Sequence, residues 1–432
     1  MALDFSNLPP EKPDPEPPSR FVWTVVFFVL TLIGVFAAFL LWPAGEPTNT
    51  PWFWTAITVF PVGFGAFVVN RRYSVYEGRR LDVKEWNKAS KEYIEREFDR
   101  ESIPVLVLGS SIHVTGVDGA ADFAKIADGS LTLGAQTSVH EESESVSARW
   151  LDLLEARLAA NDAERHAIVL EWLFDQILTD LATPLAALPV ELGLRVRLEL
   201  SGYIGEIDAL RLWKDRWQAH KRSAVQLSLA EGTSELMAVD TWLDEQNGLL
   251  STHAVLLVSI ALSTMLDANP PHGSTEAGVA LLLASAAIAE RHKLNPAAAI
   301  HRPVRSDQAD LDHALTTSLR WGNAGVRQVG SAWMTGFDGE SVGPLHASLI
   351  HIGEKAPRED ALPEFDLDRS AGNAGPSAAW LAVACAAQAA ATTARPQLVA
   401  QRLADHTVLS VVAASDETSI RKHLPHEPEI QT

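Results

Sequence analysis

Apolar residues gather first into two runs near the start of the chain. The first run, residues 21–42, contains 22 residues and no charged side chain. At about 1.5 Å of rise per residue, a helix of this length spans about 33 Å, which is enough to cross the hydrocarbon core of a bilayer. A second run covers residues 52–69, and the proline and glycines within it are tolerated in membrane helices. The pattern predicts a two-helix transmembrane anchor over residues 21–70.

The segments on either side of this anchor are polar. Residues 1–20 hold six prolines and no basic stretch before the first apolar run, which indicates a disordered tail rather than a cleavable signal peptide. Residues 71–101 mix acidic, basic and aromatic side chains, which is typical of an exposed helix with pairs such as Glu92 and Arg96. We predict a charged helical stalk. A helix lying on the membrane surface and a plain solvated linker are the alternatives.

Basic residues set the expected orientation of the anchor. Five of them lie within residues 71–84, directly after the second apolar run, whereas the connector between the runs carries a single charge, Glu46. Loops rich in lysine and arginine stay in the cytoplasm. We therefore expect the connector outside, and both the N-terminal tail and the large C-terminal part in the cytoplasm.

The rest of the chain alternates extended and helical patterns from residue 102 to about residue 416. This alternation predicts an α/β domain whose helices cover a sheet, and the polar residues 417–432 predict a loose C-terminal tail. The expected strands are 105–109, 167–176, 252–262, a run from about 279, 325–333 and 407–414; the expected helices are 147–160, 310–320, 376–392 and 396–403, with 185–247 mainly helical.

Composition and charge exclude several classes of function. With 35 basic and 55 acidic side chains the formal net charge is -20, and such a surface repels nucleic acid. The single cysteine, Cys385, rules out an intramolecular disulfide and disfavours a cysteine-based metal site. The 14 histidines are scattered, and the sequence shows no zinc-binding, phosphate-binding or dinucleotide-binding motif. We expect no metal and no cofactor.

The order of elements in the C-terminal half carries a resemblance. A strand with the pattern acidic-Ala-Gly-apolar, 276–281, is followed by an amphipathic helix and the loop 333–337, and then by a small-residue loop at Gly372 and Asn373 that runs into an Ala-rich helix. This order resembles the C-terminal half of the thiolase-like fold, especially that of β-ketoacyl synthases, over about residues 250–415 and diffusely from residue 100. The resemblance implies a thiolase-like layered α/β domain over residues 102–416, preceded by two transmembrane helices. It also implies a homodimer paired through a sheet edge.

The chemical groups of that family are missing from the matching positions. Condensing enzymes use a thiolate nucleophile and two imidazoles. The histidine positions fall on Trp333 and Asn373, neither of which can exchange a proton near neutral pH, and the lysine position falls near Asp368. Cys385 lies in the middle of the Ala-rich helix, where burial would make it inert. The resemblance therefore predicts a pseudoenzyme with no catalytic residues.

The polar residues that remain either line a vestigial pocket or simply shape loops. The alternative function is an acyl-transfer or acyl-binding enzyme with a nucleophile other than cysteine. Ser110, Ser111 and Ser370 lie in turn-like sequence, but no histidine and aspartate stand around them in a recognisable order. The candidates for the vestigial pocket are Trp333, Thr335, Asp338, Asp368 and Asn373.

The N-terminal region carries a second resemblance. The landmarks are the stretches 40–62, 71–80 and 84–93, with their prolines and aromatic residues. They resemble two-pass proteins associated with type VI secretion and its effectors, which implies an accessory of the bacterial inner membrane that engages a secretion component or an effector. The preferred hypothesis is thus a membrane-anchored adaptor or scaffold with cytoplasmic termini. A two-pass sensor is a further alternative.

Overall fold

The computed structural model describes residues 8–116, 119–222, 225–230, 235–245, 248–307, 310–354 and 362–415. These residues belong to two compact units, one formed by residues 3–98 and the other mainly by residues 99–432. The predicted C-terminal tail, residues 417–432, lies outside the described residues.

The N-terminal unit is a helical hairpin. The first helix, α1 (Arg20–Leu40), begins at the capping residue Ser19 and carries apolar side chains on all its faces. The second arm starts with α2 (Pro51–Trp54), passes through a π-helical stretch, η2 (Thr55–Val59), and continues as α3 (Phe60–Glu101). Among the described residues, these two arms are long and apolar enough to cross a membrane.

Close packing holds the two arms of the hairpin together. A Cβ atom at Gly65 of α3 would lie only 2.9 Å from Thr31 Oγ1 of α1, so glycine is required for this approach. The π-helical stretch precedes Pro61, which has no N–H to donate to the preceding turn, and an irregular turn is the usual response of a helix to proline. Sequence analysis separated the second span from the stalk, but α3 joins them in one helix.

The larger unit, which we call the body, is built on one mixed sheet. Its strand order is β11-β10-β12-β13-β8-β1-β7-β6-β4-β5, with β9 paired to β13. Strand β7 runs antiparallel to both β1 and β6, whereas β4 lies parallel to β6 and β5, and β12 lies parallel to β10. The strands of this sheet are β1 (Val105–His113), β4 (Gly193–Ser201), β5 (Gln226–Leu229), β6 (His253–Ala261), β7 (Ala277–Ser285), β8 (Ala298–Ile300), β9 (Val304–Ser306), β10 (Ala332–Thr335), β11 (Glu364–Asp366), β12 (Gln397–Arg402) and β13 (Thr407–Ala414).

The remaining elements of the body are its helices and a small hairpin. The hairpin consists of β2 (Ala135–Thr137) and β3 (Ser145–Ser147). The helices are α4 (Gly119–Ala127), η3 (Ala156–Leu158), α5 (Asp162–Asp180), α6 (Ala182–Ala186), α7 (Glu206–Ala219), α8 (Ala238–Asp244), α9 (Ala286–His292), α10 (Leu311–Trp321), η5 (Val326–Gln328), α11 (Val342–Glu354), α12 (Leu367–Ser370), η6 (Gly375–Ser377) and α13 (Ala378–Thr393).

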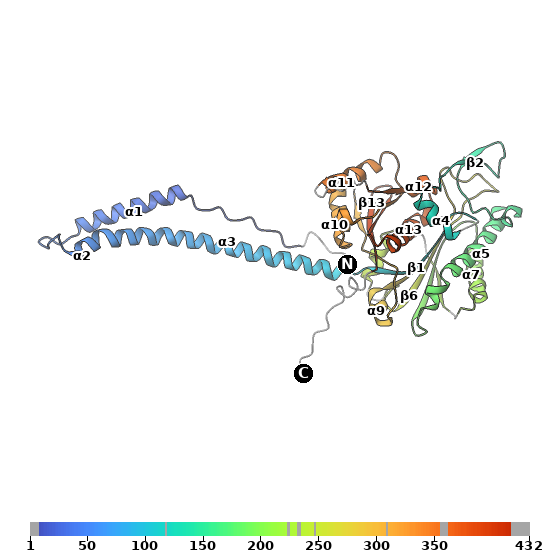
Figure 1. Ribbon diagram of the computed structural model, residues 1–432, viewed down its shortest axis with the longest axis horizontal. Helices are drawn as coiled ribbons and strands as arrows, with labels where there is room; N and C mark the ends of the chain where they lie inside the picture. The colour runs from blue at the N-terminus through green and yellow to red at the C-terminus, as the bar shows by residue number, and fades with distance from the viewer. Residues whose placement is uncertain are drawn as a thin grey trace. The chain divides into compact units, whose positions relative to one another are not determined.

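The Ala-rich helix α13 forms the middle layer of the body. One hydrophobic core joins α13 to strands from both halves of the sheet, from β6 and β7 at one end to β10 and β12 at the other. The opposite face of the first half packs on α5 and α7, and that of the second half packs on α10 and α11. Figure 1 shows α13 between these two outer helix pairs. Small side chains suit a helix that is packed on both sides, because they let the strands approach closely.

The middle layer also holds a polar contact. Trp380 of α13 stacks on Trp242 of α8, with ring centroids 5.5 Å apart and planes 4° apart. The same indole donates its Nε1–H to the buried carboxylate of Glu199, at 3.1 Å. Buried polar groups that are fully paired stabilise a unique packing arrangement.

Several local predictions were right and others were wrong. Strands β6, β7 and β13 and helices α10 and α13 lie where the pattern placed them. The strand expected at 167–176 is part of α5, which Asn161 caps through Glu164 N–H at 2.9 Å. The helix expected at 396–403 is β12, because that apolar run lies between two other strands of the sheet.

Two further expectations also failed. The helix expected at 147–160 is irregular apart from η3, since backbone groups there bond to distant residues: Leu151 N–H donates to Glu276 at 2.9 Å. The segment 185–247, expected to be mainly helical, contains β4 and β5 between its helices, and most of the segment 325–333, expected to be extended, is the short helix η5 and a loop.

Candidate functional site

A carboxylate on α12 joins the end of β10 to the loop at Asn373. Asp368 accepts hydrogen bonds from the Thr335 hydroxyl at 2.8 Å, from the Gly336 N–H at 2.7 Å and from the Asn373 side-chain amide at 3.0 Å. Gly336 has a φ of +77°, and a Cβ at this position would overlap the carbonyl oxygen of Arg402. A residue with a side chain is strained in that conformation. The structure thus brings Thr335, Asp368 and Asn373 into one cluster.

The other two candidates lie away from this cluster. Trp333 is buried and stacks on Phe365 with ring centroids 4.3 Å apart, so it is part of the core behind the loops. Asp338 lies on an exposed turn and accepts the N–H of Ser341 at 2.7 Å. Hydrogen bonds from Ser341 hold the pKa of the Asp338 carboxyl below its usual value. Trp333 therefore packs in the core against Phe365, and Asp338 stabilises the turn in which it lies.

The loop that carries Asn373 is hydrogen-bonded to a residue that lines a pocket. Asn373 N–H donates to Gly273 O at 2.8 Å, and Thr275 N–H donates to Asn373 O at 2.9 Å. Arg149 donates from Nε to Ala371 O at 3.1 Å. Arg149 in turn lines a pocket of about 750 Å³, together with Trp150, Asp152, Arg157 and Met265. Arg149 therefore links the pocket to Ala371, which lies between Asp368 and Asn373 in the chain.

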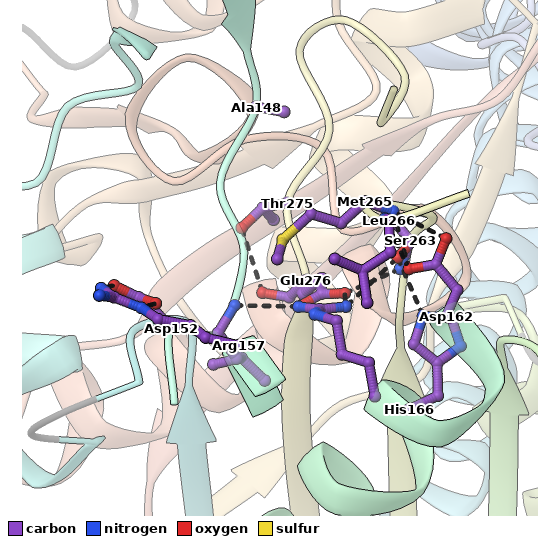
Figure 2. Close-up of polar contacts among 12 residues, drawn as sticks. Ala148, Asp152, Arg157, Asp162, His166, Ser263, Met265, Leu266, Thr275 and Glu276 are labelled. Atoms are coloured by element: carbon purple, nitrogen blue, oxygen red, sulfur yellow. Dashed lines mark hydrogen bonds and ion pairs between the residues drawn. The ribbon is translucent and has the colours of Figure 1, made fainter. Parts of the chain in front are cut away.

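A buried ion pair lies beside this pocket. Glu276 directly precedes β7, and its two oxygens accept from Arg165 NH1 at 2.7 Å and Arg165 NH2 at 2.6 Å. The same carboxylate accepts Ser263 N–H at 3.0 Å and Leu151 N–H at 2.9 Å. Both charged side chains are 0% exposed. Figure 2 shows Glu276 at the centre of these contacts. Glu276 connects α5, the segment at Leu151 and the loop after β6, so its carboxylate fixes the positions of three chain segments.

A second buried carboxylate holds the loop after β6. Asp162, in the first turn of α5, accepts the N–H groups of Met265, Leu266 and Asp267 at 2.9 to 3.1 Å. His166, one turn further on, contacts Ser263 O through Nε2 at 2.9 Å (Figure 2). The backbone donors of this loop are therefore bonded to the chain's own carboxylates rather than free for an incoming anion.

The two arginines that line the pocket have different partners. Asp152 accepts hydrogen bonds from Nε and Nη2 of Arg157, and these hydrogen bonds lower the pKa of the Asp152 carboxyl. Arg149 donates instead to carbonyl oxygens of Ala371 and Thr132. Burial lowers the pKa of the Arg149 guanidinium, although arginine remains charged at neutral pH. The pocket can thus hold an anionic or carbonyl-bearing group beside Arg149. Among the described residues, no group of three His, Cys, Asp or Glu could hold a metal ion.

Ser111 of β1 belongs to a buried polar cluster that no sequence pattern predicts. Ser111 Oγ lies 2.7 Å from Asp180 Oδ2 and 3.0 Å from His113 Nε2, and the same histidine nitrogen lies 2.9 Å from Asp180 Oδ2. Ser111 and His113 are 2% and 1% exposed. Burial raises the pKa of the Asp180 carboxyl, but hydrogen bonds from His113 and Ser111 outweigh it and hold that pKa below its usual value.

This cluster differs from a nucleophile–base–carboxylate relay. In such a relay the serine and the carboxylate bond to different ring nitrogens, whereas Ser111 and Asp180 both contact Nε2 of His113. Within the described part of the chain, Nδ1 of His113 is buried with no hydrogen-bond partner. Alternation along a strand could have predicted that Ser111 and His113 share a face, but no local pattern points to Asp180.

The other nucleophile candidates are held by hydrogen bonds. Ser110 lies on β1 and accepts from the Gln388 side chain at 3.3 Å, and Ser370 donates to Asp366 O at 2.9 Å. Cys385 is fully buried in the middle of α13, and burial raises the pKa of its thiol. The expected burial of this cysteine is confirmed, and its inertness stays a prediction.

Comparison with known proteins shows the fold of the body. No protein-family model matches the chain, and no curated protein matches it in sequence. Among solved structures, the chain is similar to the ketosynthase from module 6 of the bacillaene synthase from Bacillus subtilis 168, with a TM-score of 0.51 and 8% identity over 72% of both chains. It is also similar to ketosynthase twelve from the bacillaene polyketide synthase of Bacillus amyloliquefaciens, with a TM-score of 0.50 and 9% identity over 74% of both chains. The thiolase-like fold expected from the sequence is confirmed.

The same comparison corrects one prediction. The missing family residues predict that the protein is not an enzyme but a pseudoenzyme of the β-ketoacyl synthase type. The structural neighbours are ketosynthases, so the body has the fold of an enzyme and that conclusion is contradicted.

Proposed function

We propose that this chain is a two-pass protein of the bacterial inner membrane. Its ketosynthase-like body would act at the cytoplasmic face as an adaptor or scaffold that holds a protein partner, a component or an effector of type VI secretion. The two apolar arms of the hairpin, the five basic residues directly after the second apolar run and the sequence landmarks of the N-terminal region support this proposal.

The observation that carries the proposal is the pair formed by the Asp368 cluster and the adjoining pocket. At positions where the resemblance places a lysine and a histidine, Asn373 donates to Asp368 at 3.0 Å and so connects α12 to the loop that follows it. The pocket beside them, of about 750 Å³, presents Arg149 on an otherwise acidic protein. The charged residues of its lining, Arg149, Arg157 and Asp152, sum to one net positive charge, which suits an acidic segment of a partner.

Photocrosslinking from the pocket tests this function. A benzophenone amino acid at Trp150, which lines the pocket, is compared in intact cells with one at Ile207, which is 74% exposed on α7. A discrete adduct with a second protein at Trp150, absent at Ile207 and weakened by Arg149→Ala, is expected. No adduct at Trp150, or the same adducts at both positions, contradicts the adaptor function.

The orientation is tested separately. A cysteine at Thr48 in the connector should react with a membrane-impermeant maleimide added outside, whereas one at Glu155, exposed on the body, should react only after the membrane is broken. Native Cys385 is buried and gives little background. Labelling of Glu155→Cys in sealed cells would reject the proposed topology.

A second candidate function is acyl transfer with a serine nucleophile. The Ser111, His113 and Asp180 cluster, in a body with a ketosynthase fold, favours it. The test is a serine-directed fluorophosphonate probe applied to the full chain in detergent, with Ser111→Ala and Ser370→Ala as matched variants. Labelling that only Ser111→Ala removes supports this candidate, and equal labelling of all three proteins, or none, excludes it.

A further inference from the structure

The N-terminal tail is bound along α3 within the hairpin unit. Sequence analysis predicted disorder for residues 1–20, but the described part of this tail makes defined contacts with the charged half of α3. Asn87 forms two hydrogen bonds with the main chain of Lys12: it accepts the Lys12 N–H at 2.8 Å and donates to the Lys12 carbonyl at 2.9 Å. A side-chain amide that pairs with both groups of one residue fixes the register of an extended peptide.

Two neighbouring side chains of α3 continue this recognition. Trp86 donates its Nε1–H to Pro10 O at 3.2 Å, and Ser90 donates its hydroxyl to Pro9 O at 2.8 Å. Ser90 is 5% exposed, so the tail covers it. The Lys12 ammonium lies 3.7 Å from the centroid of the Trp86 ring, a cation–π contact. Residues 86 and 90 are four apart and residues 87 and 90 are three apart, so both Trp86 and Asn87 neighbour Ser90 on the helix surface.

The chemistry of these contacts fits a proline-rich peptide. Such segments favour an extended, left-handed conformation whose carbonyl groups are not bonded internally, so the ordering entropy lost on binding is small. Proline has no N–H, and the site supplies donors to the carbonyls of Pro9 and Pro10 while accepting one N–H, from Lys12. An aromatic ring next to hydrogen-bond donors is a common way to recognise this kind of segment.

We propose that Trp86, Asn87 and Ser90 form a binding site for a proline-rich extended peptide, and that residues 9–12 of the same chain occupy it. The site acts as a latch that fastens the start of the chain to α3. It has a consequence for topology, because residues 9–12 can reach residues 86–90 only on the same side of a bilayer. If α1 crosses the membrane, the apolar part of α3 must cross back.

A peptide that competes with the tail tests this site. The probe is a fluorescent peptide with the sequence of residues 8–18, titrated against the full chain in detergent and followed by fluorescence anisotropy. In the native protein the attached tail has an effective concentration of about a millimolar, so the free peptide should bind weakly. Lys12→Pro removes both the N–H that Asn87 accepts and the ammonium on Trp86, and it should increase peptide affinity at least about tenfold by emptying the site.

Variants of α3 identify the site. Asn87→Ala in the Lys12→Pro background should abolish the gained binding, and Ser90→Ala should reduce it. Lys88→Ala is the matched control, because Lys88 is 69% exposed and pairs with Glu92 rather than with the tail. Equal peptide binding by the native and Lys12→Pro proteins, or binding unaffected by Asn87→Ala, overturns the proposal.

Amide exchange provides a second measurement that needs no added peptide. The Lys12 N–H should exchange slowly in the native protein and faster in Asn87→Ala, with circular dichroism verifying that α3 remains helical. Slow exchange that appears only in a dimer, seen by mass measurement in detergent, would mean that copies exchange their tails and would overturn occupancy within one chain. Exchange unchanged in Asn87→Ala would remove the site altogether.

Discussion

Replacement of Glu276 should destabilise the body more than any surface change. Glu276→Ala leaves the Arg165 guanidinium, which is 0% exposed, without its carboxylate. Removing one partner of a buried ion pair costs about 3–5 kcal/mol, because the other charge remains buried. The N–H groups of Leu151 and Ser263 also lose their acceptor, and each unpaired buried group adds about 1–3 kcal/mol unless water replaces the carboxylate.

The expected total is therefore at least about 3 kcal/mol, or more than about a hundredfold in the unfolding equilibrium. Such a loss is a large share of the 5–15 kcal/mol that is typical of a folded domain, so a variant that still folds is also needed. Arg165→Met combined with Glu276→Leu removes both charges at similar volume. Paired removal of a buried ion pair is often close to neutral, and the double variant should lose only what the two unpaired N–H groups contribute.

Urea unfolding of the full chain in detergent, followed by tryptophan fluorescence, measures this order. Trp213, Trp333 and Trp380 are buried in the body and report its unfolding. Glu155→Gln, at an exposed position, is the control and should change the unfolding free energy by less than about 0.5 kcal/mol. If the double variant is less stable than Glu276→Ala, or if Glu276→Ala resembles the control, the reasoning about the buried pair is wrong.

Three further predictions address other groups. The Asp180 carboxyl has a folded pKa below its ordinary value of 3.8. It therefore contributes stability above pH 3.8, and this contribution is lost as the pH falls through the folded pKa. In urea unfolding at a series of pH values, the stability difference between native protein and Asp180→Asn should be constant near neutrality and shrink below about pH 4. Gly336→Ala should lower the melting temperature, because a φ of +77° costs a residue with a side chain about 1–2 kcal/mol before any displacement of its neighbour. Gly339→Ala is the control and should leave the melting temperature unchanged, because the space around its Cβ position is open. Equal melting temperatures for the two variants would refute this. Cys385 should resist maleimide in the folded protein at neutral pH and react after unfolding in urea, since burial raises the pKa of its thiol, and stoichiometric labelling of the folded chain, read by mass spectrometry, would contradict it.

Local pattern was enough to predict the long apolar elements. The runs that form α1, β6, β7 and α13 were predicted from the sequence because each is a continuous apolar stretch bounded by polar or small residues. The run at 167–176 was assigned to the wrong class, since continuous apolar sequence has no period that separates a buried strand from a buried helix. The same ambiguity affected β12.

Tertiary structure alone decided which distant residues meet. Asp368 meets Thr335 across 33 positions, Ser111 meets Asp180 across 69, and Lys12 meets Asn87 across 75. Sequence marked Asp368 and Ser111 as candidates but could not pair them, because such contacts depend on the crossing of elements rather than on the residues beside them. Periodicity reports which face of a helix or strand is apolar. The partner on that face depends on how the whole chain packs, and that is why the cluster at Asp368 and the latch on α3 appear only in three dimensions.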